Sequence, residues 1–112
     1  MEAYGNQNLM YANGGQFISY AVSSEASAAL DERTIAVELV ATTDCWVNIG
    51  GPGETPTAAK PGAEATRGDS VPLRAEVEKT FAINLGNATN KVKIAVIQDS
   101  AAGVLQITER RA

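Results

Sequence analysis

The stretch Lys91–Glu109, with the sequence KVKIAVIQDSAAGVLQITE, decides the fold of this chain because it contains two alternating segments joined by a turn. The apolar residues predicted to line the inner face of these two strands are Val92, Ile94, Val96, Leu105 and Ile107. Alternation with a period of two is typical of a strand that buries one face. Between the two strands, Asp99–Gly103 predicts a hairpin turn in which Gly103 can adopt a positive φ.

The stretch Ala41–Gly50, ATTDCWVNIG, predicts another half-buried strand after a bend at Thr42–Asp44. The residues on its predicted inner face are Cys45, Val47 and Ile49, and those on the opposite face are Trp46 and Asn48. Further strands are predicted over Phe17–Val22, Arg33–Ala41 (with Ile35, Val37 and Leu39 on one face), Val71–Ala75 and Val77–Leu85. About six to eight short strands separated by turn signals predict an all-β fold, either a small β-sandwich or a jelly-roll-like domain.

The 112 residues are enough for one domain with a single core. We expect residues 1–16 to form a flexible N-terminal arm, with a joint at Asn13–Gly15, and residues 17–112 to form a single β-sandwich domain. Gly51–Ser70 lacks any periodicity and predicts one long, projecting loop. The bulky side chains expected to fill the core are Phe17, Trp46 and Phe81.

The charge pattern argues against nucleic acid as a partner. The formal net charge is −4, and the first 32 residues contain four acidic residues and no Lys or Arg. Without a basic stripe, nothing would drive binding to a phosphate backbone. No apolar run is long enough to span a membrane and no signal peptide is recognisable, so we expect a soluble protein that is made in the cytoplasm and has no contact with a membrane.

The residue types needed for common enzymatic chemistry are scarce. The sequence contains no histidine, which removes the most frequent general base and zinc ligand. The only cysteine, Cys45, is predicted to be a buried and inert thiol. Gly50–Gly53 lacks the Lys-Ser/Thr pair of a phosphate-binding loop, and Arg67-Gly68-Asp69 is read first as a tight turn. We therefore expect no catalytic residues, no cofactor, no metal and no enzymatic activity.

Five stretches, taken in order, resemble small virion proteins of phages. They are Ser27–Leu30 (SAAL), Thr42–Gly50 (TTDCWVNIG), Pro56–Ala59 (PTAA), Lys93–Ile97 (KIAVI) and Ala101–Glu109 (AAGVLQITE). Proteins of this kind are small all-β components of the particle, and some resemble capsid decoration, or cement, proteins. The chain departs from the pattern between Thr57 and Val71, where its loop is longer and more charged. For Ser23–Glu32 the composition favours a short helix with Ser24 as N-cap, whereas the resemblance favours a strand at Ser27–Leu30.

The resemblance implies a virion structural protein on the capsid surface that binds the lattice of the major capsid protein and forms a homodimer or homotrimer. Its acidic arm would meet a basic patch on the capsid. The residues that we expect to bind partners are Tyr4, Leu9, Met10, Tyr11, Trp46, Arg67 and Asp69. Trp46 has a second interpretation, in which it lies between the sheets or under the long loop. Two other functions stay open: a component of the neck, tail or fibre base, and a carbohydrate- or receptor-binding module built from Trp46, Tyr20 and the long loop.

Overall fold

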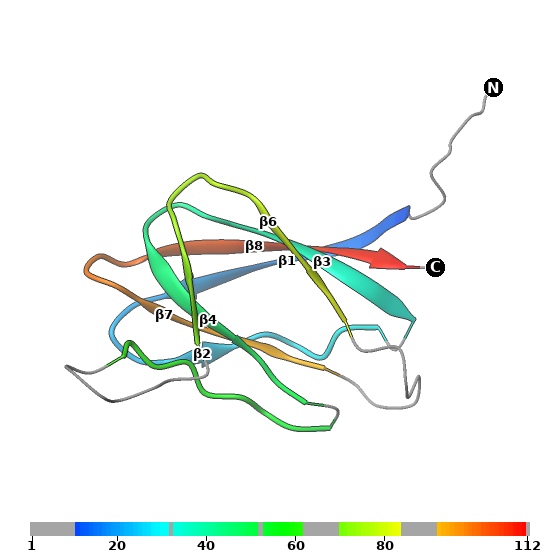
Figure 1. Cartoon of the computed structure of the whole chain (residues 1–112), viewed down its shortest axis with the longest axis horizontal. Coiled ribbons are helices and arrows are strands. Elements are labelled where there is room, and N and C mark those ends of the chain that lie inside the picture. Colours follow the sequence, from blue (N-terminus) through cyan, green and yellow to red (C-terminus); the bar gives the residue numbers. More distant parts are fainter. Residues whose placement is uncertain (1–10, 32, 52, 62–69, 84–91, 112) are drawn as a thin grey trace.

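The computed structural model describes residues 11–31, 33–51, 53–61, 70–83 and 92–111, which form two packed four-stranded antiparallel sheets (Figure 1). The strands are β1 (Tyr11–Tyr20), β2 (Glu25–Ala26), β3 (Thr34–Ala41), β4 (Cys45–Ile49), β5 (Val71–Leu73), β6 (Lys79–Ala82), β7 (Ile94–Gln98) and β8 (Gly103–Arg111). The prediction of an all-β sandwich is confirmed. Within the described residues, no helix is long and apolar enough to cross a lipid bilayer.

The order of the strands is that of a jelly roll. Sheet A has the order β1-β8-β3-β6, and sheet B has the order β2-β7-β4-β5. The first strand pairs with the last, the second with the seventh, the third with the sixth and the fourth with the fifth. The chain is thus one long folded hairpin, rolled up so that β8 meets β3 and β7 meets β4.

The core lies between the inner faces of the two sheets. Its largest fully buried side chains are Leu30, Val37, Leu39, Val47, Leu73, Ile94, Val96, Leu105 and Ile107. Tyr20 is the buried aromatic residue, and Phe81 packs against the core while partly exposed. The expectation for Phe17 was wrong, because its side chain is 74% exposed on the outer face of β1. Trp46 also lies outside the core, on the outer face of β4 beside Pro72 and Ile97.

A β-bulge changes the alternation that was predicted for β3. The register between β3 and β8 shifts between Thr34 and Ala36, so that Ile35 has no direct partner on β8. After the bulge Val37, Leu39 and Ala41 point into the core as buried residues. Ile35 was predicted to share their face, but the extra residue of a bulge reverses the facing of whatever precedes it. Thr34 therefore points inward and is buried.

The first described strand begins earlier than predicted. β1 starts at Tyr11, and the segment up to Gln16 pairs with β8 instead of belonging to an arm. The predicted joint at Asn13–Gly15 is a β-bulge, with a register shift between Ala12 and Gly14. The segment after β1 also differs from both expectations. Only Glu25–Ala26 forms a strand, and Ser27 and Leu30 continue alongside β7 through backbone hydrogen bonds.

The first part of the long loop packs against sheet B, which corrects the expectation of a projecting loop. Ala58 is only 2% exposed, and its N–H donates to Ser24 Oγ at 2.9 Å. Asn48, on the outer face of β4, donates from Nδ2 to the Thr57 carbonyl at 3.0 Å. Ala95 points outward from β7 yet is fully buried. Residues 53–61 therefore cover part of the outer face of sheet B, near Asn48.

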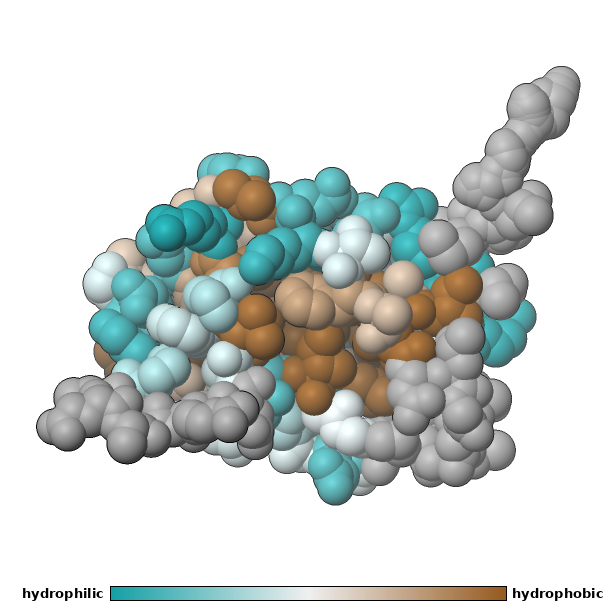
Figure 2. Space-filling model, viewed as in Figure 1, coloured by the Kyte–Doolittle hydropathy of each residue, from teal (hydrophilic) through white to brown (hydrophobic). Residues whose placement is uncertain are grey.

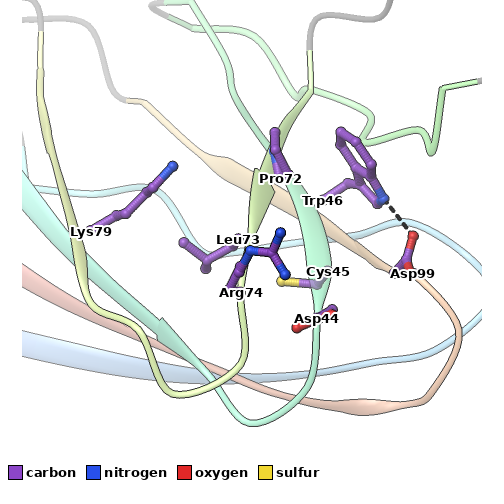
Figure 3. Close-up of a pocket in the computed structure, with 8 residues that line it drawn as sticks. All are labelled: Asp44, Cys45, Trp46, Pro72, Leu73, Arg74, Lys79 and Asp99. Atoms are coloured by element: carbon purple, nitrogen blue, oxygen red, sulfur yellow. Dashed lines mark hydrogen bonds between the residues drawn. The ribbon is translucent and has the colours of Figure 1, made fainter.

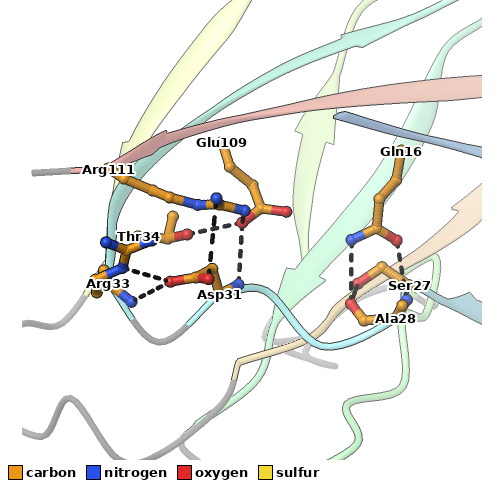
Figure 4. Close-up of polar contacts among 8 residues, drawn as sticks. All are labelled: Gln16, Ser27, Ala28, Asp31, Arg33, Thr34, Glu109 and Arg111. Carbon is orange, nitrogen blue, oxygen red and sulfur yellow. Dashed lines mark hydrogen bonds and ion pairs between the residues drawn. The ribbon is translucent and has the colours of Figure 1, made fainter. Parts of the chain in front are cut away.

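A buried polar cluster ends the sandwich where β3 begins and β8 ends (Figure 4). Glu109 belongs to the last part of β8 and is 5% exposed. Its Oε1 accepts the Thr34 hydroxyl at 2.8 Å and the Asp31 N–H at 3.0 Å, and Arg111 Nη2 lies 3.4 Å away. Arg111 also pairs with Asp31 at 3.9 Å. A buried carboxylate is tolerated here because its lone pairs have donors.

Candidate partner-binding surfaces

Two of the seven predicted partner-binding residues lie in the described part of the chain. Tyr11 is the first residue of β1 and pairs with Arg111 of β8. Trp46 lies on β4. The other five, Tyr4, Leu9, Met10, Arg67 and Asp69, fall outside the described residues. Tyr11 and Trp46 belong to different sheets, since β1 is in sheet A and β4 is in sheet B.

Trp46 lines a pocket of about 300 Å³ beside the edge strands β5 and β6 (Figure 3). The pocket is lined by Asp44, Cys45, Trp46, Pro72, Leu73, Arg74, Lys79 and Asp99. Its polar side chains carry both signs of charge, and its apolar part comes from the indole, the proline ring and Leu73. A mixed lining of this kind suits a small polar ligand or a partner side chain.

Figure 2 views the molecule from a side on which apolar residues gather between the two sheets.

Asp99 holds the Trp46 ring in place. The indole Nε1–H donates to Asp99 Oδ1 at 3.0 Å, a contact between residues 53 positions apart in the sequence. This hydrogen bond is the main reason that the pKa of the Asp99 carboxyl lies below its ordinary value, and the nearby Lys60 lowers it further. Lys60 Nζ lies 3.4 Å from the carboxylate and donates to the Asp99 carbonyl at 3.0 Å. The covering loop and the Trp46 pocket therefore share Asp99.

Cys45 is an inert part of the core. The thiol is 1% exposed, and burial raises its pKa to about 11. A thiol with so high a pKa has almost no thiolate at neutral pH, and only the thiolate is a good nucleophile. The prediction that this side chain is buried is confirmed.

Tyr20 cannot take part in a surface site with Trp46. It is 2% exposed and points into the sandwich, whereas Trp46 points outward from sheet B. The Tyr20 hydroxyl donates to the Thr43 carbonyl at 2.8 Å and accepts the Thr43 N–H at 3.2 Å. These bonds fasten the bend between β3 and β4 to the end of β1. The carbohydrate site suggested by the sequence therefore loses one of its two aromatic residues.

The outer face of sheet A carries the most exposed aromatic side chain of the described residues. Phe17 points outward from β1, opposite Gln106 of β8. Its neighbours along β1 are the exposed Gly15 and Ser19. On the same face Glu38 of β3 and Arg110 of β8 form an ion pair at 2.7 Å. Sequence reasoning missed Phe17 as a surface residue, although the alternation with Ile18 and Tyr20 placed it on the opposite face from both.

The described residues offer little for metal binding. No group of three His, Cys, Asp or Glu side chains among them is arranged to hold a metal ion. Glu38 and Glu78 form a pair of neighbouring carboxyl groups. The hydrogen bond between them lowers the pKa of Glu38 and raises the pKa of Glu78. Both lie on the surface next to Arg110, which partners Glu38. Their arrangement is that of a surface charge cluster.

Comparison with known protein families, with curated proteins and with solved structures finds no match for this chain.

Proposed function

We propose that this chain is a structural protein of a phage virion that decorates or cements the capsid by binding the lattice of the major capsid protein. In this role it is made in the host cytoplasm, acts on the capsid surface and catalyses no reaction. The jelly-roll strand order is compatible with the proposal, since viral capsid proteins use it, but lectins and cupins use it as well. A fold alone does not define a function, so the proposal depends on the surface.

The observation that carries the proposal is the outer face of sheet A, on which Phe17 is exposed in the described part of the chain. Exposed aromatic side chains on a rigid sheet are suited to anchor a protein contact, because they bury a large area at a small entropic cost. A small module repeated over a symmetric shell gains avidity from its fixed geometry even when each contact is weak. The acidic character of the first 32 residues would complement a basic patch on the shell.

The test is whether the chain is a stoichiometric part of purified particles of the virus that encodes it. We expect quantitative mass spectrometry to find it in numbers comparable to the major capsid protein. We also expect the purified chain to bind capsids assembled without it. A chain absent from particles, or present only in the few copies of a neck or tail ring, would contradict the proposal.

The contribution of the N-terminal segment needs a deletion that ends before Tyr11. A longer deletion, up to Gly15, would remove five residues of β1 that pair with β8 and would weaken the sandwich itself. Removal of Glu2–Leu9 leaves β1 complete. If this segment contacts the shell, occupancy on capsids should fall while the thermal unfolding midpoint stays the same.

The Trp46 pocket supports a second candidate function, binding of a carbohydrate or another small polar ligand. Its indole, Pro72 and the charged residues Asp44, Arg74 and Lys79 combine an apolar wall with hydrogen-bonding groups. Glycan binding that disappears in Trp46→Ala but persists in Phe17→Ala would favour this function over capsid decoration.

A further inference from the structure

The four edge strands of the sandwich differ strongly in how well they are protected from pairing with another strand. β2 has two residues, β5 has three residues including Pro72, and β6 has four residues beginning with Lys79. Short length, proline and lysine are the common means by which proteins prevent edge-to-edge association. β1 is an edge strand of ten residues. It is therefore the edge best suited to accept another strand.

β1 also lacks the charges that would repel a partner. The sequence Tyr11–Tyr20, YANGGQFISY, contains no Lys, Arg, Asp, Glu or Pro. Its one protective feature is the bulge between Ala12 and Gly14. From Gly14 to Tyr20 the register with β8 is continuous. This part of the strand is a regular and uncharged edge.

The hydrogen-bond pattern of sheet A shows which groups of β1 face outward along the sheet. Thr42 N–H donates to the Val104 carbonyl at 3.0 Å, so the peptide groups of Val104 point toward β3. Because the direction alternates along an antiparallel strand, Gly103, Leu105 and Ile107 of β8 point toward β1 and bond their partners there. Those partners on β1 are Tyr20, Ile18 and Gln16. The β1 residues that alternate with them are Gly15, Phe17 and Ser19. Their N–H and C=O groups therefore point to the open edge, and all three residues are exposed.

We propose that β1 pairs with β1 of a second copy of this chain, antiparallel and across a two-fold axis, with Phe17 opposite Phe17 of the partner. In this register Gly15 faces Ser19 of the other copy, and the three outward-pointing residues form about six main-chain hydrogen bonds across the axis. Sheet A of one copy then continues into sheet A of the other. The two phenyl rings lie side by side on the outer face, where aromatic pairs stabilise neighbouring strands.

A second copy is the occupant that the charges favour. Each copy has a net charge of −4, so most contacts between copies are repulsive, whereas the β1 edge is neutral. An antiparallel strand pair is self-complementary under a two-fold axis, so one edge supplies both halves of the interface. The pairing also covers Ile18, which packs against the core while partly exposed. It does not depend on the proposed capsid role, because it forms between purified chains in solution.

The test is the association state of the full chain in solution. Sedimentation velocity should show dimers whose fraction grows with concentration, and Phe17→Lys should raise the dissociation constant by about 30-fold or more. Val77→Lys is the control, because Val77 is an exposed apolar residue outside β1 and the introduced charge is the same. The control should dimerise like the original chain. Both variants should fold, since both side chains are exposed.

Ser19→Pro tests the backbone part of the pairing. Proline is tolerated in an edge strand where its missing N–H faces outward, so the monomer should keep its fold while the dimer weakens. Hydrogen exchange gives a local measure: the amides of Phe17 and Ser19 should become protected as the concentration rises. A chain that stays monomeric up to about 1 mM overturns the proposal. So does a dimer that is indifferent to Phe17→Lys and Ser19→Pro. If the monomeric chain binds capsids and Ser19→Pro abolishes that binding, the edge accepts a strand of another protein, which also overturns the proposal.

Discussion

The two outer faces of this sandwich are treated in opposite ways. On sheet B the chain covers part of its own surface: Ala95 points outward yet is fully buried, and Ala58 of the loop is itself 2% exposed. On sheet A no other part of the described chain lies over Phe17, which is 74% exposed. The comparison shows that apolar content alone does not decide which face is covered. Specific donors and acceptors, such as Ser24 Oγ and Asn48 Nδ2, hold the loop on sheet B.

The test with the largest expected change in the free energy of unfolding introduces the same charge on both faces. Ala58→Asp places a carboxylate in a buried position, so the free energy of unfolding should fall by about 3 kcal/mol. Phe17→Asp replaces an exposed side chain and should change it by less than about 0.5 kcal/mol. Urea unfolding at low protein concentration measures both. Equal effects would mean that the loop does not cover sheet B in solution or that the Phe17 face is buried.

A smaller effect is expected where the covering loop leaves sheet B. A Cβ added at Gly50 would lie 2.8 Å from Cδ of Pro56, whose ring cannot move aside easily. Gly50→Ala should therefore reduce the free energy of unfolding by about 2 kcal/mol. Gly51→Ala is the control, because its new Cβ would meet only the flexible carboxylate of Glu54. A difference between the two variants sharpens the view that the loop is held close to the sheet.

The strand framework could be predicted from the sequence because it depends on local alternation. Val92–Ile107 shows a clear period of two, and it forms the inner faces of β7 and β8 as expected. The bulge in β3 could not be predicted in this way. Whether Ile35 faces the core depends on how β3 aligns with β8, and the two strands are distant in the sequence. Phe17 was misplaced because both faces of β1 carry an aromatic residue, and only the bonds from Tyr20 to Thr43 distinguish them.

The candidate site was harder to predict than the fold because distant residues define it. Trp46 was recognised from its position opposite the core, but its partner Asp99 comes from the turn between β7 and β8. The course of the loop was missed because the groups that hold it lie outside it. Its Gly, Pro and Ala residues predicted irregular structure correctly, but Ser24 lies 34 positions from Ala58, and Asn48 belongs to the preceding strand β4.

A third comparison of the faces uses two serines: Ser24, which bonds the loop on sheet B, and Ser19, which lies on β1 of sheet A. Ser24 Oγ accepts the Ala58 N–H at 2.9 Å, so Ser24→Ala leaves that donor without its partner and should cost about 1 kcal/mol. Ser19 is exposed on β1, and Ser19→Ala should change the free energy of unfolding by less than about 0.5 kcal/mol. Hydrogen exchange at the Ala58 amide should become faster only in Ser24→Ala. Unchanged exchange there would remove Ser24 from the groups that hold the loop.

The smallest expected effect concerns acid, and it acts on the covered face alone. The pKa of Asp99 is lowered in the folded chain, mainly by the Trp46 hydrogen bond, from an ordinary value of 3.8. A lowered pKa contributes stability that is present above pH 3.8 and is lost as the pH falls through the folded value.

In Trp46→Phe the hydrogen bond is gone, so carboxyl NMR titration should show the Asp99 pKa moving up toward 3.8. The variant should then lose less stability on acidification, although it is less stable at neutral pH. Since Lys60 of the loop also binds Asp99, protonation of Asp99 should lower the protection factor of the Ala58 amide, whereas the protection factor of the Ile18 amide in β1 stays constant. An Asp99 pKa that is indifferent to Trp46→Phe would mean that the indole does not hold this carboxylate.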